Sequence, residues 1–509
     1  MTTFSAASRV VRPTWTARLL AAVVVTVVST SILSGAVATQ AHAASPPDLD
    51  TLTNSLNRNG PLIMAAYDVP GAAVAVVRDG ENAWSSGYGL ASVEYGTRMT
   101  ADTVFQVASI SQTLTAWGVM LLVEAGEVSL DSPIEAYLTR WAFPSSEYDA
   151  SGVTVARVLN HTAGLNRVDI YPLPDDQPLR SLEESLAGDN GGGQSARIDT
   201  EPGQQFNYSN AGYTLLQLMI EERTGQRFAD FMQVAILDPL GMTNSTFDPE
   251  RVSSQATGYY PTGEALPHYR LTEQAAGGLY STANDLARLM AASMPGPDGE
   301  RAGRGVLTSD SVETMMARHD VPDGSSVSFG YQVDDLENGY TTTGNFGRNV
   351  GWIANAVMIP ELGEGIVILT NSDTESTGLT LRSWTRWLGV SDTVTTQNAD
   401  RALDQLSTIL LVGAAAVFLG VLVVLIIIAV QARRRSRRWL WQVRPSLPRL
   451  VTRGAIMVVA VGGLVAFLTW PERQQYVALL PSEAAIVLAA VVLAIGTVAL
   501  LVSTQRASK

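Results

Sequence analysis

The stretch "FQVASISQTLTAWGVM" places Ser109 at the start of an apolar helical pattern. The first turn of a helix offers free backbone N–H groups and a partial positive charge, which favour an alkoxide and a developing oxyanion. Gln112 follows three residues later on the same face, where a hydroxyl nucleophile would need a base. An amide can hold a hydroxyl but takes no proton at neutral pH. Taken alone, Ser109 is better explained as an N-cap serine.

Two later stretches add polar side chains of matching chemistry. Tyr208 and Asn210, in "FNYSNAGY", precede a helical pattern, and in an extended segment residues two apart point the same way. A phenol beside a serine can shuttle its proton, and an amide can hold a substrate carbonyl. The glycines of "TTTGNFGRNVGW" let a ligand approach a strand edge. Each stretch alone also has a purely structural explanation, as a buried tyrosine with an N-cap asparagine or as a glycine-rich strand entry.

The elements around these residues predict an α+β domain. Residues 71–89 form two strand-like runs joined by Asp79 and Gly80, a strong hairpin signal. Helical patterns follow at 111–125, 154–165, 211–225, 281–293 and, last, 377–389, and strand-like runs return at 328–336, 352–360 and 364–371. Strands at both ends with helices between them predict an antiparallel sheet built from both termini, beside a helical subdomain.

The three motifs in this order resemble the penicillin-recognising serine hydrolases, in the branch of class C β-lactamases, D-alanyl-D-alanine carboxypeptidases and related esterases. The resemblance runs from roughly Leu52 to Leu388 and includes "VLNHTAGL", "AAGGLYSTANDLARL", "LGMTNSTF" and "IVILTNSD". It implies the β-lactamase/transpeptidase-like fold, an antiparallel sheet flanked by helices with a helical subdomain.

The family's site motifs match this sequence position by position. Its S-x-x-K matches Ser109–Gln112, its Y-x-N matches Tyr208–Asn210, and its Lys or His, any residue, Gly matches Asn345–Gly347. The resemblance implies that Ser109 is the nucleophile and Tyr208 the proton shuttle. The residues expected to bind substrate are Gln112, Asn210, Asn345, Gly347 and Arg348.

Both basic positions of the family pattern are lost, to Gln112 and Asn345. With no nearby cation, Tyr208 is expected to remain a phenol. A well-placed general base contributes about 10²–10⁴-fold, so acylation should be slow. Arg348 could restore positive charge or bind a carboxylate if it points inward, and is otherwise a solvated surface arginine.

Histidines offer little replacement for the two lost basic side chains. His161, in "HTAGL", is expected to form a structural turn, and His268 and His319 have no assigned place.

Composition excludes several other functions. There is no cysteine, and the only lysine is Lys509. No metal-ligand spacing or dinucleotide fingerprint occurs, so neither a metal nor a cofactor is expected. Residues 44–400 hold 45 Asp and Glu against 19 Arg, and this negative charge argues against nucleic-acid binding.

The two ends of the chain predict export and a membrane domain. Residues 1–43 have a basic start, an apolar run and "AHAAS", as in a signal peptide, with an uncleaved anchor as the alternative. The expected domain covers 44–390 and a linker 391–407, followed by transmembrane helices at 408–430, 454–470 and 484–502. The 431–453 loop carries eight arginines, which predicts that it and the C-terminus are cytoplasmic.

Two functions from different classes fit this sequence. The first is a membrane-anchored, extracytoplasmic serine hydrolase of reduced activity, acting on a small molecule or a peptide, amide or ester of the cell envelope. The second is an inactive pseudoenzyme that binds a cell-wall peptide or a protein partner. The hydrolase is favoured because Ser109, Tyr208 and Asn210 are all retained.

Overall fold

The computed structural model describes residues 48–390, apart from 168–169, 189–193, 253, 325, 337–338 and 375. The predicted signal peptide, linker, cytoplasmic loop and three transmembrane helices lie outside these residues. Among the described residues, no helix is both long and apolar enough to cross a membrane.

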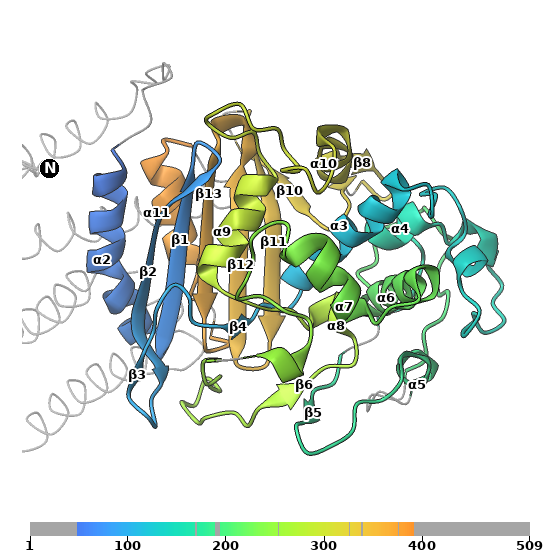
Figure 1. Ribbon diagram of the computed structural model, residues 1–509, viewed down its shortest axis with the longest axis horizontal. Coiled ribbons are helices and arrows are strands. Elements are labelled where there is room, and N and C mark those ends of the chain that lie inside the picture. The colour runs from blue at the N-terminus through green and yellow to red at the C-terminus, as the bar shows by residue number, and fades with distance from the viewer. Residues whose placement is uncertain are drawn as a thin grey trace, which may run out of the picture. The chain divides into compact units, whose positions relative to one another are not determined.

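A seven-stranded antiparallel sheet forms the framework, in the order β10-β11-β12-β13-β1-β2-β3 (Figure 1). Its strands are β1 Gly71–Arg78, β2 Glu81–Ser92, β3 Thr97–Arg98, β10 Gln332–Asp335, β11 Thr341–Asn349, β12 Trp352–Ile359 and β13 Glu364–Thr370. The prediction of a sheet built from both ends is therefore confirmed. Asp79 and Gly80 turn the β1–β2 hairpin with φ of 52° and 69°, a left-handed pair that suits a tight two-residue turn.

Alternating side chains give the sheet two buried faces. In β1, Ala73 and Ala75 point into the larger core, whereas Val74 and Val76 point into a second, smaller one. The smaller core is closed by α2 and α11, which share it through Leu52, Leu56 and Trp384. Because both faces are covered, the central strands read as nearly continuous apolar runs.

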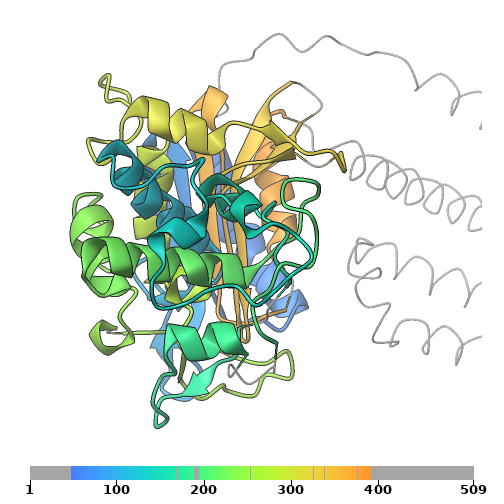
Figure 2. The same ribbon diagram turned by 90° about the vertical axis from the view of Figure 1, so that its right-hand side faces the viewer.

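Helices cover both faces (Figures 1 and 2). Their bounds are α2 Leu49–Ala66, α3 Ile110–Glu124, α4 Val155–Leu159, α5 Leu182–Ala187, α6 Asn210–Thr224, α7 Phe228–Met232, α8 Gln274–Gly277, α9 Ala283–Ala292, α10 Ser309–Met316 and α11 Gly378–Trp387. Figure 2 shows the helices between α3 and α7 stacked in front of the sheet, which agrees with the expected helical subdomain. Short strands complete the fold: β4 Phe105–Gln106, β5 Leu173–Pro174, β6 Tyr269–Arg270, β7 Tyr280–Ser281, β8 His319–Asp320 and β9 Ser326–Val327.

Two predicted elements are shorter than their patterns. The helical pattern at 154–165 gives only α4, because His161 and Gly164 adopt left-handed backbone conformations with φ of 60° and 72°. The run at 328–336 gives only β10, because Gly330, with φ of 72°, turns the chain before the strand begins.

Candidate active site

Ser109 stands at the mouth of α3, and its hydroxyl is not used as a helix cap. Ser109 occupies the N-cap position but makes no side-chain capping bond. Its Oγ lies 2.7 Å from the Tyr208 hydroxyl instead. Ala108, directly before it, has φ of 49°, a strained conformation for a residue with a side chain. The structure therefore aims this hydroxyl at Tyr208 rather than at its own helix.

Gln112 holds Tyr208 from the opposite side. Its Nε2 donates to the Tyr208 hydroxyl at 2.6 Å, and lies 3.4 Å from both Asn210 Oδ1 and the Ala276 carbonyl oxygen. Ser209 caps α6 through its side chain, so Asn210 is the first helical residue rather than the cap. Residues 109, 112, 208 and 210 thus share one hydrogen-bonded cluster.

His161 fixes the orientation of the Gln112 amide. The Ser209 backbone N–H donates to His161 Nδ1 at 3.2 Å, so the neutral imidazole carries its proton on Nε2. That Nε2–H lies 3.1 Å from Gln112 Oε1 and donates to it. Burial lowers the pKa of His161 to about 3, so the ring stays neutral. Gln112 consequently turns its oxygen to His161 and its NH₂ group to Tyr208.

Tyr208 remains a phenol at neutral pH, as the sequence predicts. Burial raises the pKa of Tyr208, and the hydrogen bonds from Ser109 and Gln112 and the charge of Arg167 offset this only in part. The Arg167 guanidinium carbon lies 5.8 Å from the centre of the Tyr208 ring. With a neutral His161 beside it, the cluster contains no group that readily accepts the Ser109 proton.

Asn345 joins the edge of the sheet to α3. Its Nδ2 donates to the Ser109 carbonyl at 3.2 Å, to Thr113 Oγ1 at 3.2 Å and to the Gly330 carbonyl at 3.1 Å. A Cβ at Gly347 would lie 2.2 Å from the Val107 carbonyl oxygen, so only glycine lets β11 approach this closely. The edge of β11 therefore runs directly beside the nucleophile.

Arg348 lies apart from this cluster. Its side chain is exposed, and its Nη2 donates to the Asp373 carbonyl at 3.0 Å. The cation that acts on Tyr208 is Arg167. A substrate-binding role for Arg348 stays a prediction.

A cavity of ≈ 360 Å³ adjoins the cluster, large enough for part of a substrate. Its wall includes Gln112, His161, Tyr208, Asn345 and Asp334.

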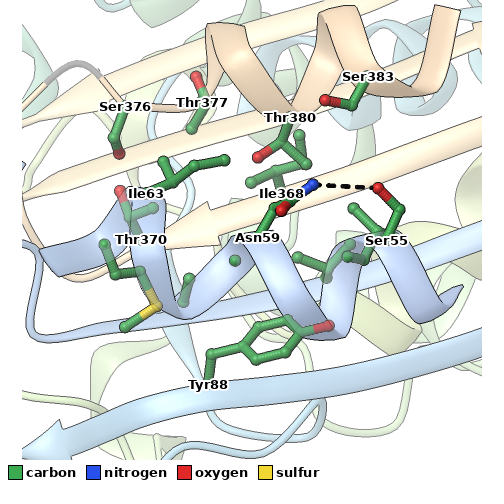
Figure 3. A pocket seen from close by; sticks show the side chains of 15 residues that line it. Ser55, Asn59, Ile63, Tyr88, Ile368, Thr370, Ser376, Thr377, Thr380 and Ser383 are labelled. Carbon is green, nitrogen blue, oxygen red and sulfur yellow. Dashed lines mark hydrogen bonds between the residues drawn. The ribbon is translucent and has the colours of Figure 1, made fainter. Parts of the chain in front are cut away.

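A second cavity, between α2, α11 and the opposite face of the sheet, measures only ≈ 30 Å³ (Figure 3). Ser55 and Asn59, hydrogen-bonded at 3.1 Å, lie in its wall. That volume holds about one or two waters, so this cavity is no substrate site.

Sequence reasoning gave no site role to His161 or Arg167. The sequence signal for His161 is its place in "HTAGL", which favours a structural turn over a role as a base. A single arginine six residues later carries no spacing signal at all. Within the described residues, no three or more His, Asp or Glu side chains are grouped to hold a metal ion.

Comparison with known proteins agrees with this geometry. The sequence model of the family described as Beta-lactamase matches residues 58–389, more than half of the chain. The chain belongs to the beta-lactamase family. The membership accounts for the antiparallel sheet, for the serine at a helix mouth and for the tyrosine beside it.

Relatives within this family include penicillin-binding proteins. Protein flp of Staphylococcus aureus is 22% identical over 317 residues, which cover 60% of this chain and 60% of that protein. Penicillin-binding protein 4* of Bacillus subtilis is 29% identical over 201 residues, covering 36% of this chain and 41% of that one. The chain therefore spans 60% and 41% of the length of these two relatives, less than two thirds of each.

Solved structures support the same fold. The octameric penicillin-binding protein homologue from Pyrococcus abyssi aligns with a TM-score of 0.56 and 26% identity, covering 67% of this chain and 78% of that one. SurE aligns with a TM-score of 0.54 and 25% identity, covering 67% and 76%.

Proposed function

We propose that this protein is a serine acyl-transfer hydrolase of reduced activity, acting on a peptide, amide or ester of the cell envelope. The observation that carries the proposal is the 2.7 Å contact between Ser109 Oγ and the Tyr208 hydroxyl, at the mouth of α3. Penicillin-binding relatives favour a cell-wall peptide as the substrate.

The reaction begins with attack of Ser109 Oγ on the substrate carbonyl. The Ser109 proton passes to the Tyr208 oxygen as the phenolic proton moves to the leaving group, which gives an acyl-enzyme and a released alcohol or amine. The α3 N-terminus and the nearby β11 edge offer N–H groups to the oxyanion. Water then hydrolyses the acyl-enzyme. Because Tyr208 stays a phenol, this shuttle is concerted and slow compared with transfer to a preformed base.

Covalent labelling tests the proposal. The purified full-length chain is incubated with a fluorophosphonate probe, a fluorescent penicillin and a p-nitrophenyl ester, beside Ser109→Ala. Label on the wild type that is absent from the variant supports a Ser109 nucleophile. Lack of label and of ester cleavage, with both proteins folded, contradicts it.

The neutrality of the cluster favours one second candidate, a binding protein without turnover. Gln112, Asn345 and the neutral His161 provide no base, yet the cavity beside them is retained. Such a protein would hold a cell-wall peptide or a partner protein in the cavity. Absence of labelling together with peptide binding would favour this function over the hydrolase.

We also propose that the domain is extracytoplasmic and tethered by the C-terminal apolar segments. The basic and apolar pattern of 1–43 and the eight arginines of 431–453 support this topology. A reporter enzyme that works only outside the cytoplasm should be active when it is fused after residue 390. A reporter that works only in the cytoplasm should be active when it is fused after Lys509. The reverse pattern would overturn the topology.

A further inference from the structure

The Tyr208 oxygen carries part of a negative charge during the proposed reaction. It gives its proton to the leaving group and takes one from Ser109, whose Oγ lies 2.7 Å away. Whenever the first transfer runs ahead of the second, the phenol becomes partly phenolate. A hydrogen-bond donor or a cation that acts on this oxygen then lowers the barrier to acylation.

The side chains packed directly around this oxygen are neutral. Gln112 Nε2–H donates to it at 2.6 Å, and His161 holds the Gln112 amide in that orientation. Burial lowers the pKa of His161 to about 3, and burial raises the pKa of the neighbouring Tyr213. Both rings are therefore uncharged at neutral pH. A positive charge that acts on Tyr208 has to come from farther away.

Arg167 supplies the one charge among the described residues that shifts the pKa of Tyr208, and it shifts it downwards. Its guanidinium carbon lies 5.8 Å from the centre of the phenol ring, within the range of a cation–π contact. Arg348, near the β11 edge, donates to the Asp373 carbonyl instead. The sequence has no lysine before Lys509 that could take this place.

Hydrogen bonds on both sides of the tyrosine fix the segment that carries the arginine. Asn207, one residue before the tyrosine, donates through Nδ2 to the Leu165 carbonyl at 2.7 Å. Ser209, one residue after it, donates through Oγ to the Asn166 carbonyl at 2.8 Å. Leu165 and Asn166 are themselves buried. The two residues before Arg167 are therefore held against the tyrosine segment, so tertiary packing sets the distance between arginine and ring.

We propose that Arg167 is a positioning residue for acylation, whose charge stabilises the phenolate character that Tyr208 gains while the Ser109 proton is in transit. Arg167 thereby takes over part of the work of the basic side chains that the sequence lacks at positions 112 and 345. The inference rests on the proposed hydrolase, because it names a further residue of that same reaction. Since the arginine is exposed, its effect should be small and sensitive to salt.

Single-turnover acylation of the full-length chain by p-nitrophenyl acetate tests this role, with Ser109→Ala as the background. The substrate is uncharged, so salt does not change its approach to the site. Arg167→Met should acylate roughly two- to fivefold more slowly than the wild type in low salt, the range for an exposed charge. The difference should shrink in about 1 M NaCl, where charges are screened beyond about 3 Å. Arg167→Lys should keep most of the wild-type rate.

The pH profile separates this role from a structural one. Acylation should become faster at alkaline pH as Tyr208 begins to lose its proton. Removing the positive charge makes that proton harder to lose, so Arg167→Met should move the rise in rate to higher pH. A variant that only loosened the segment would slow acylation equally at every pH.

Arg197→Met is the matched control. Arg197 pairs with Asp199 at 2.7 Å, and its backbone N–H donates to Asn166 Oδ1 at 2.9 Å. The control therefore removes the same charge from the segment next to Arg167. Its rate, salt dependence and pH profile should match those of the wild type.

The outcomes separate the two proposals. If the wild type is not acylated, the hydrolase fails and the role of Arg167 fails with it. If the wild type is acylated and Arg167→Met matches it in rate and pH profile, only the role of Arg167 is overturned. Equal losses in Arg167→Met and Arg197→Met overturn it as well. Should Arg167→Met not fold, a wild-type rate that falls with salt supports the role, and a constant rate overturns it.

Discussion

Replacing Gln112 by lysine should restore a base to a site that is already shaped to hold one. The Gln112 Nε2 lies 2.6 Å from the Tyr208 oxygen and 3.4 Å from both Asn210 Oδ1 and the Ala276 carbonyl oxygen. An ammonium there would donate to the same acceptors, and the adjoining cavity of ≈ 360 Å³ has room for the longer side chain. Burial would lower the lysine pKa towards neutrality, which suits a general base.

The size of the effect follows from two opposing terms. A general base contributes about 10²–10⁴-fold to the rate. Against it, His161 Nε2–H loses its acceptor on Gln112, and leaving a buried donor unpaired costs about 1–3 kcal/mol. That cost falls on folding stability more than on the acylation step. We therefore expect Gln112→Lys to acylate about a hundredfold faster and to melt at a lower temperature.

Single-turnover acylation by p-nitrophenyl acetate and a fluorescent penicillin measures the gain. Gln112→Met is the control, because it has a similar length without a proton-accepting nitrogen. A double variant that adds Ser109→Ala subtracts any reaction of the new lysine itself. If Gln112→Lys is folded and no faster than Gln112→Met, the missing base does not limit the rate, and the proposed role of this position is wrong.

Three further predictions follow from the same cluster. Tyr208→Phe should slow labelling of the nucleophile about a hundredfold while the protein stays folded, and an unchanged rate would remove Tyr208 from the shuttle. His161 has its pKa lowered from 6.5 to about 3, so the unfolded chain binds that proton first, and stability falls by ~1.4 kcal/mol per pH unit as pH drops from 6.5 to about 3. In urea unfolding, the stability of His161→Asn should lack this contribution to the pH dependence. Glu364, whose pKa is raised to about 7, contributes a pH dependence of opposite sign in both proteins, so it cancels when the two are compared. Equal pH dependence of stability in the two proteins would contradict the burial of His161. Gly347→Ala should lose about 1–3 kcal/mol and most labelling, because the new Cβ would meet a backbone oxygen at 2.2 Å, whereas Gly378→Ala, at the roomy first position of α11, should keep full labelling and lose no stability.

The local parts of this structure were predictable from short-range rules. Asp79 and Gly80 predicted the first hairpin because few residues tolerate its left-handed turn. Ser109 and Gln112 lie on one helix face, as their spacing predicts, and both contact the Tyr208 hydroxyl there. By contrast, the pattern at 154–165 was wrong in length, because His161 takes a left-handed conformation that no periodicity announces.

The contacts between residues far apart in the sequence could be predicted only from the resemblance to the family, or could not be predicted at all. Tyr208 lies ninety-nine positions after Ser109, and only the family pattern placed the two together. The hydrogen bond from His161 to Gln112 depends on the backbone N–H of Ser209, which fixes the tautomer. Such a bond is set by tertiary packing, and no property of the "HTAGL" segment predicts it. Arg167 acts through its distance from one ring, which sequence spacing does not encode.

The central position of β13 has a consequence for how the protein is made. This strand pairs with β1 on one side and β12 on the other, and Ala72 meets Thr370 across the chain. A ribosome must therefore synthesise nearly the whole domain before the middle of the sheet can close. Bringing segments this far apart together costs roughly 5 kcal/mol of chain entropy, which favours slow, late folding. Such late closure of the sheet is the behaviour that the proposed export would require, because a chain must be unfolded to pass through a membrane channel.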